Sequence, residues 1–198
     1  MPLIFNLQPR EKWPPAAMIG FAALAVGLGV VSAWAAPGTP GFLGTGLAFI
    51  MLAIAVIDAR LFVIPDELTV AAFILALIDA AVIEPQAIVE AVGLAVLRGA
   101  ALALLFFGLR AGYRRLRGRE GIGLGDVKLA GVAGAWLGWL TIPIAVEIAA
   151  LAALAAYGIR YYAVGRPFEA ALKFPFGLFF APAIWLGWLL DATLLAPF

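Results

Sequence analysis

Long apolar stretches recur along the whole chain, separated by short polar or Pro- and Gly-rich segments. Seven stretches predict helices, and we place them at residues 17–36, 41–58, 67–83, 88–109, 125–139, 142–162 and 175–195. Most approach the roughly 20 residues that a helix needs to cross the core of a bilayer. Segments such as PGTPG at 37–41 contain the residues that end helices and turn the chain. The pattern therefore predicts an all-α polytopic membrane protein, a bundle of about seven transmembrane helices.

Composition agrees with a membrane location. The mean hydropathy is +1.08 and only 13% of the residues are charged, whereas a typical soluble domain has about 25% charged residues. No connection is long enough to form a separate domain, so we expect residues 1–198 to form a single membrane-embedded domain. The first apolar run begins near Met18 and is one of many, which favours a membrane span over a removable signal peptide.

Positive charges predict the orientation. When the chain is threaded through seven spans, 12 of its 13 Lys and Arg residues fall on one side. An excess of Lys and Arg marks the cytoplasmic side, so we place the N-terminus in the cytoplasm and the C-terminus outside. The largest group lies in the predicted loop 110–119 and consists of Arg110, Arg114, Arg115, Arg117 and Arg119. We expect this loop to attract anionic lipids, and we predict no nucleic-acid partner.

Arg98 is the exception to this distribution. It lies about ten residues into the fourth span, where a charge is costly and normally has a partner. Asp79 and Glu147 are predicted at a similar depth, and we expect one of them to pair with Arg98. Such a pair could be structural or could form a second functional site.

The inventory of reactive side chains is short. The chain has no Cys and no His, and its only serine, Ser32, lies within the first span. These absences exclude Ser-His-Asp and Cys-His hydrolases and remove the Cys and His side chains that usually bind zinc in proteins. We predict neither a metal nor a cofactor. Any hydrolysis would have to use carboxylates.

Two aspartates are predicted at the same membrane face. Asp58 ends the second span and Asp126 begins the fifth. A plain surface charge is the alternative for Asp58, and a helix cap is the alternative for Asp126. As a pair, the two carboxyls could share a proton, activate a water and protonate an amide leaving group. The dipoles of their own helices predict that Asp126 is ionised and Asp58 protonated.

Glycines surround Asp126. Gly123 and Gly125 allow the backbone to approach its neighbours closely before the fifth helix starts. Farther along, Gly134 and Gly138 form a G-x-x-x-G pattern, which favours tight contact between helices. A close approach there could bring Asp126 near the second span.

Other polar residues stand beside the two aspartates. Asp66 follows Pro65 and precedes an apolar run, so we predict that it caps the third helix. Lys128 follows Asp126 by two residues. It could stabilise the ionised form of Asp126, contact an acidic substrate residue, or simply extend to the membrane interface.

Three segments resemble the type IV prepilin peptidases, membrane aspartic proteases with a G-x-G-D motif. They are IDARLFVIPDELT (57–69), GLGDVKLAGVAGAWLGW (123–139) and FPFGLFFAPA (174–183), within a similarity that covers roughly 45–190. The resemblance implies a helical bundle in the bacterial inner membrane that removes the leader of prepilins or pseudopilins at the cytoplasmic face, for type IV pili or type II secretion. By motif, it also implies that Asp58 and Asp126 are the catalytic residues. We further predict supporting or substrate-contacting roles for Lys128, Gly123, Gly125 and Pro65.

One departure from the family pattern limits the expected activity. Bifunctional members carry a cysteine-containing domain and also methylate the new N-terminus, but this chain has no Cys. It resembles the short, peptidase-only members, and we do not expect N-methyltransferase activity. Two alternatives stay open: a G-x-G-D protease with another signal-like substrate, and a non-enzymatic, proton-coupled transporter that uses Arg98, Asp79 and Glu147.

Overall fold

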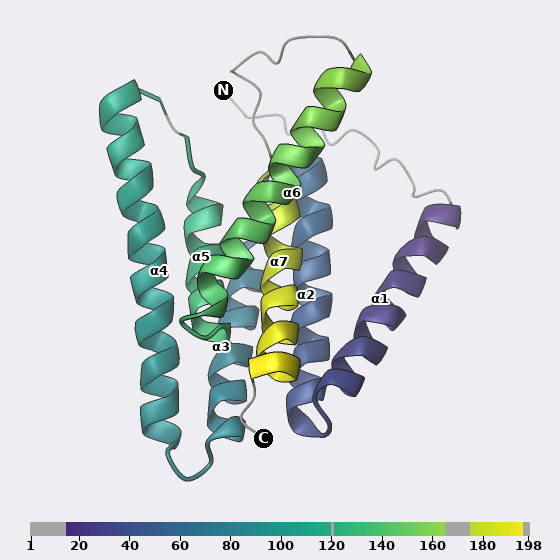
Figure 1. Cartoon of the computed structure of the whole chain (residues 1–198), viewed down its shortest axis with the longest axis vertical. Coiled ribbons are helices and arrows are strands. Elements are labelled where there is room, and N and C mark those ends of the chain that lie inside the picture. The colour runs from purple at the N-terminus through teal and green to yellow at the C-terminus, as the bar shows by residue number, and fades with distance from the viewer. Residues whose placement is uncertain (1–14, 120, 165–174, 196–198) are drawn as a thin grey trace, which may run out of the picture.

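The computed structural model describes residues 15–119, 121–164 and 175–195, and its described residues form seven α-helices followed by a π-helical turn. This confirms the predicted all-α bundle (Figure 1). The elements are α1 (Pro15–Ala35), α2 (Thr39–Leu61), α3 (Asp66–Ile83), α4 (Ile88–Arg117), α5 (Leu124–Trp136), α6 (Thr141–Val164), α7 (Gly177–Leu190) and the π-helical turn η1 (Asp191–Leu195).

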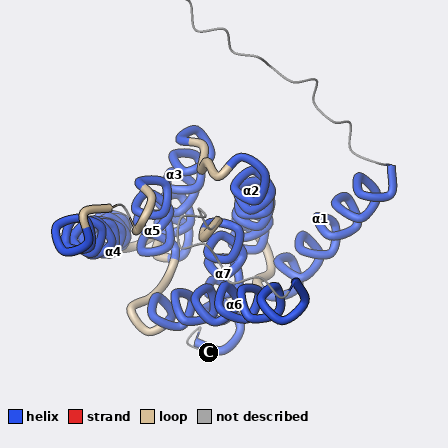
Figure 2. The backbone as a smooth tube through the Cα atoms, turned by 90° about the horizontal axis from the view of Figure 1, so that it is seen from above, coloured by secondary structure: helices blue, strands red, loops and turns tan. Residues whose placement is uncertain are grey.

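The helices are arranged around a central pair, α2 and α7, which pack side by side. Helices α3, α4 and α5 form one flank, α6 crosses a face of the bundle, and α1 leans away from it (Figure 2). The chain alternates in direction, so α2 ends at the same end of the bundle where α3, α5 and α7 begin (the upper end in Figure 1). We call this the site end.

Five of the described helical segments are long and apolar enough to cross a membrane: 18–35, 39–61, 88–117, 141–159 and 177–194. Helix α5 has 13 residues, which extend about 20 Å and fall short of a bilayer core of roughly 30 Å. Large apolar side chains cover the outer faces of α4 and α6, and Leu104 and Leu154 are 68% and 65% exposed. Faces of this kind are stable against lipid rather than water, so the chain is a multi-pass membrane protein.

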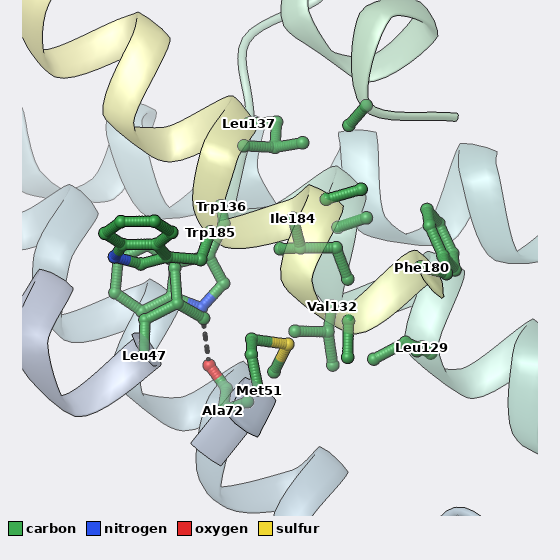
Figure 3. Close-up of a cluster of buried hydrophobic side chains, with 14 of the residues drawn as sticks. Leu47, Met51, Ala72, Leu129, Val132, Trp136, Leu137, Phe180, Ile184 and Trp185 are labelled. Atoms are coloured by element: carbon green, nitrogen blue, oxygen red, sulfur yellow. Dashed lines mark hydrogen bonds between the residues drawn. The ribbon is translucent and has the colours of Figure 1, made fainter. Parts of the chain in front are cut away.

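The buried core lies between α2, α5 and α7 (Figure 3). Leu47 and Met51 of α2, Leu129 of α5 and Ile184 of α7 belong to this one cluster, and all four are almost completely buried. On α5, the indole Nε1 of Trp136 donates a 2.9 Å hydrogen bond to the backbone oxygen of Ala72 on α3. The short helix α5 is therefore held on several sides, which fixes the position of its N-terminus at the site end.

The predicted arginine-rich loop is largely helical. Helix α4 continues to Arg117 and ends at Gly118, which has a φ of +69°. Arginine is a good helix former, and positive charges in the last turn complement the helix dipole. Arg110 is buried rather than facing solvent, and its Nη1 donates a 2.7 Å hydrogen bond to the backbone oxygen of Ile122. Arg110 thereby ties the end of α4 to the segment that leads into α5.

The prediction for Gly134 and Gly138 was wrong. Gly138 lies beyond the end of α5, so the two glycines do not share a helix face. Gly134 faces α4 instead, and a Cβ atom there would lie 2.4 Å from the backbone oxygen of Arg98. Opposite it, a Cβ on Gly99 would lie 2.8 Å from the backbone oxygen of Gly131. The tight contact at Gly134 therefore joins α5 to α4, whereas Asp126 lies near Asp58 of α2 without any contribution from Gly138.

Substituting Gly134 by Ala is expected to destabilise the bundle by about 1–3 kcal/mol, because the added methyl group forces two backbones apart. The measurement is the thermal unfolding midpoint of the purified protein in detergent. Gly108→Ala on α4 is the matched control, since a Cβ at that position meets nothing within 4 Å. An equal midpoint for the two variants would contradict the tight α4–α5 crossing.

Arg98 does not pair with either predicted partner. Its Nε donates a 3.3 Å hydrogen bond to the backbone oxygen of Gly134, and the negative charge that acts on its guanidinium is that of Asp191. Asp79 is buried, and its Oδ1 has no hydrogen-bond partner among the described residues. Glu147 is exposed on α6. The sequence could not reveal that the charge of Asp191 acts on Arg98, because only the packing of the helices brings two residues so distant in the chain within electrostatic range.

Asp191 also holds the beginning of α6. Its Oδ2 accepts a 3.0 Å hydrogen bond from the backbone N–H of Gly138, and the hydroxyl of Thr141 donates to the same oxygen at 2.7 Å. Thr141 is fully buried. Asp191 thus fixes the start of α6 to the end of α7, at the end of the bundle opposite the site end.

Candidate active site

Asp58 is buried at the site end, in the last turn of α2. Its Oδ2 accepts a 3.0 Å hydrogen bond from the backbone N–H of Leu178, and the neighbouring N–H of Gly177 also favours the ionised form of this carboxyl. These two residues begin α7, where backbone N–H groups have no partner within their own helix. Asp58 is therefore not the plain surface charge that was its alternative interpretation.

Asp126 is the third residue of α5 and is partly buried. Its Oδ2 accepts a 3.1 Å hydrogen bond from the backbone N–H of Gly123. The side chain therefore does cap the helix, as its alternative interpretation expected, although from the third helical position. A carboxyl group has a second oxygen, so this bond leaves Asp126 able to act on another group.

The structure brings the two aspartates together from helices that are distant in the sequence. They are near enough for the charge of Asp58 to act on Asp126. Between their helices lies the buried side chain of Ile64. A Cβ on Gly125 would lie 3.0 Å from the Cβ of Ile64, and a Cβ on Gly177 would lie 2.8 Å from its Cδ1. Both glycines allow α5 and α7 to close on this one side chain.

The turn after α2 places Ile64 in that position. Phe62 adopts the left-handed conformation with a φ of 54°, and its N–H donates a 3.0 Å hydrogen bond to the backbone oxygen of Asp58. Such a conformation is uncommon for a residue other than glycine and is often found near functional sites. Pro65 is the N-cap of α3, without a side-chain cap, and Asp66 is the first helical residue. The prediction that Asp66 caps this helix was wrong.

Asp66 instead forms an ion pair with Lys128. The pair connects the first turns of α3 and α5 at the site end, and the side chains of Lys128 and Asp66 are 45% and 67% exposed. Exposed ion pairs stabilise a fold by at most about 1 kcal/mol. The pair gives Lys128 a partner that none of its three proposed roles included.

The prediction that Asp126 is ionised and Asp58 protonated considers only the dipole of the helix that carries each residue. The dipole of α2 by itself disfavours negative charge on Asp58, which lies in the last turn of that helix. In the structure, the N-terminus of α7 also faces Asp58 and stabilises negative charge on it. Helix dipoles therefore no longer distinguish the two residues, and which carboxyl holds the proton stays a prediction.

Sequence reasoning gave no role to three residues of the site: Ile64, Gly177 and Leu178. Gly177 belongs to the quoted PFG segment, and a glycine directly before an apolar run is the one available signal. No sequence pattern indicates which distant carboxylate would meet it. Among the described residues there is no group of three or more Asp or Glu side chains that could hold a metal ion.

Residues 45–159 match the type IV leader peptidase family. The chain belongs to this family. The matched region contains both Asp58 and Asp126, whereas Gly177 lies beyond it. Family membership supports a peptidase, and no solved structure matches the chain.

Curated members of the family differ in how much of their length the chain covers. Leader peptidase HopD of Salmonella typhimurium strain LT2 is 31% identical over 139 residues, which are 69% of this chain and 86% of that protein. The prepilin leader peptidase/N-methyltransferase of Dickeya chrysanthemi is 40% identical over 119 residues, 58% of this chain and 39% of the relative. The prepilin leader peptidase/N-methyltransferase of Aeromonas salmonicida strain A449 is 30% identical over 161 residues, which are 79% of this chain and 52% of that protein. The chain thus spans about half or less of the relatives named as methyltransferases.

Proposed function

We propose that this chain is a membrane aspartic endopeptidase that removes the N-terminal leader of type IV prepilins or pseudopilins at the cytoplasmic face. In this proposal, Asp58 and Asp126 share one proton. The ionised carboxyl takes a proton from a water as that water attacks the scissile carbonyl, and the protonated carboxyl gives its proton to the leaving amine. The substrate class is that named for the relatives.

The observation that carries this proposal is the meeting of Asp58 and Asp126. One is buried and the other partly buried, and they interact electrostatically across the end of the bundle. Two carboxyls in a partly desolvated site do not ionise independently, which is the arrangement that acid–base hydrolysis needs. The site end also carries Arg60, Arg114, Arg115, Arg117 and Lys128, and this excess of positive charge supports a cytoplasmic orientation.

The proposal is tested by incubating the purified protein with a prepilin in detergent or liposomes. We expect a single cut that releases the leader, seen as a mass shift and located by sequencing the new N-terminus. A protein that leaves prepilins intact but cuts another signal-like substrate would favour the alternative protease. Intact substrates of both kinds would contradict the proposed activity.

The transporter alternative loses its support in the structure. It required Arg98, Asp79 and Glu147 to work together. Arg98 interacts with Asp191, whereas Glu147 is exposed on α6. The three residues do not form one centre, so we do not carry this function further.

Variants of Lys128 and Asp66 separate the roles left open for the lysine. If Lys128 acts only through its ion pair, then Lys128→Gln and Asp66→Asn should have equal, small effects, and the double variant should be no worse than either. If Lys128 also contacts an acidic substrate residue, Lys128→Gln alone should raise KM for the prepilin several-fold. Steady-state cleavage kinetics measure the difference, and an unchanged KM in Lys128→Gln would contradict substrate contact.

A further inference from the structure

Asp58 lies where its own helix cannot stabilise it. It occupies the last turn of α2, whose free carbonyl groups disfavour a negative charge nearby. At the start of α7, the N–H of Leu178 donates a hydrogen bond to the carboxylate, and the N–H of Gly177 adds to the stabilisation of its charge. The location of Asp58 is thus set by a helix far along the chain.

The approach of α7 depends on the missing side chain of Gly177. A Cβ at this position would lie 2.8 Å from Oδ2 and 3.0 Å from Cγ of Asp58. It would also lie 2.8 Å from Cδ1 of Ile64. Gly177 has a negative φ, so the requirement is for space and not for an unusual backbone conformation. Any larger residue must move the carboxylate, Ile64 or the start of α7.

Ile64 transmits this constraint to the other aspartate. It is 7% exposed and touches α7 at Gly177 and α5 at Gly125, the residue before Asp126. A shift of Ile64 would therefore move the start of α5 as well. Through Ile64, the space at Gly177 therefore helps to set the distance between the two carboxyl groups.

We propose that Gly177 is a positioning residue for the peptidase: it lets the N-terminus of α7 hold the Asp58 carboxylate and set its place relative to Asp126. The inference rests on the proposed function. The inference goes beyond that function by assigning a role to a residue outside the two aspartate motifs. Gly177 itself does not take part in proton transfer.

The test is Gly177→Ala in the full chain with a prepilin substrate. Because a displacement of about 1 Å at a reacting group can cost about 10²-fold in rate, we expect kcat to fall about 10²-fold with KM little changed. Displacing the N–H donors of α7 also makes the Asp58 anion less stable, so the limb of the kcat/KM profile that reports the ionisation of Asp58 should move to higher pH. This is the acidic limb if Asp58 is the base and the alkaline limb if Asp58 holds the proton. A merely structural role would lower the amount of active protein without moving this limb.

Two further variants keep the test decisive. Gly108→Ala is the control, because the same substitution there meets nothing within 4 Å. Leu178→Pro removes the N–H that donates to Asp58 without placing a Cβ at residue 177, and proline is tolerated in the first turn of a helix. It should shift the pH profile in the same direction, and it decides the question if Gly177→Ala does not fold.

Infrared difference spectra provide a readout that does not depend on activity. The carboxyl bands of Asp58, assigned with Asp58→Asn, should change in Gly177→Ala and stay constant in Gly108→Ala. The positioning role would be overturned if the wild type cleaves its substrate but folded Gly177→Ala or Leu178→Pro has the wild-type pH profile and unchanged carboxyl bands. An inactive wild type would instead contradict the proposed function.

Discussion

Replacing either Asp58 or Asp126 by Asn is expected to lower kcat/KM for leader removal by at least about 10³-fold, while the protein stays folded. Loss of one general acid–base group typically costs 10²- to 10⁴-fold. Because the two carboxyls act as a unit, the double variant should be little worse than either single variant. The measurement is the initial rate of prepilin cleavage, with the unfolding midpoint recorded for each variant.

Asparagine is the informative substitution because it keeps the structural bonds of both residues. Its amide oxygen can still accept from the N–H of Leu178 at position 58 and from that of Gly123 at position 126. Lost activity would therefore reflect lost acid–base chemistry and not an unsatisfied helix end. Asp66→Asn is the control, since this carboxylate lies at the same end but binds Lys128. Wild-type rates in either the Asp58 or the Asp126 variant would contradict the dyad.

Replacing Asp191 by Ala is expected to lower the stability of the bundle by about 2–4 kcal/mol. The change removes the acceptor for Gly138 and Thr141 and leaves Arg98 without its negative partner. Unsatisfied donors cost about 1–3 kcal/mol each when buried, and an uncompensated charge adds to this loss. Thermal or denaturant unfolding in detergent measures the effect.

A double variant measures how much of the lost stability comes from the uncompensated charge of Arg98. Removing Arg98 as well, with Arg98→Met in the Asp191→Ala background, should restore part of the stability because no buried charge is then left unpaired. Glu147→Gln is the matched control for removing a carboxylate, since Glu147 is exposed on α6. Effects of Asp191→Ala and Arg98→Met that simply add would contradict the interaction between the two residues.

Much of the fold follows from local patterns. The apolar stretches predicted seven helices, and all seven are present, because hydrophobic length and the Pro- and Gly-rich breaks depend on near neighbours in the sequence. The helix ends were less predictable. The arginine-rich segment was expected to be a loop, but polarity alone does not end a helix, and Gly118 with its positive φ does.

By itself, the sequence determined the all-α membrane class, the lack of His and Cys, and the placement of two candidate aspartates at one face. Only the tertiary structure decided their surroundings. It showed that α7 reaches Asp58, that Ile64 lies between the two helix starts, and that the negative charge acting on Arg98 is that of Asp191 rather than that of Asp79 or Glu147. The physical reason is that hydropathy fixes the depth of each residue in the membrane, whereas the rotation and neighbours of each helix depend on side-chain packing between distant segments.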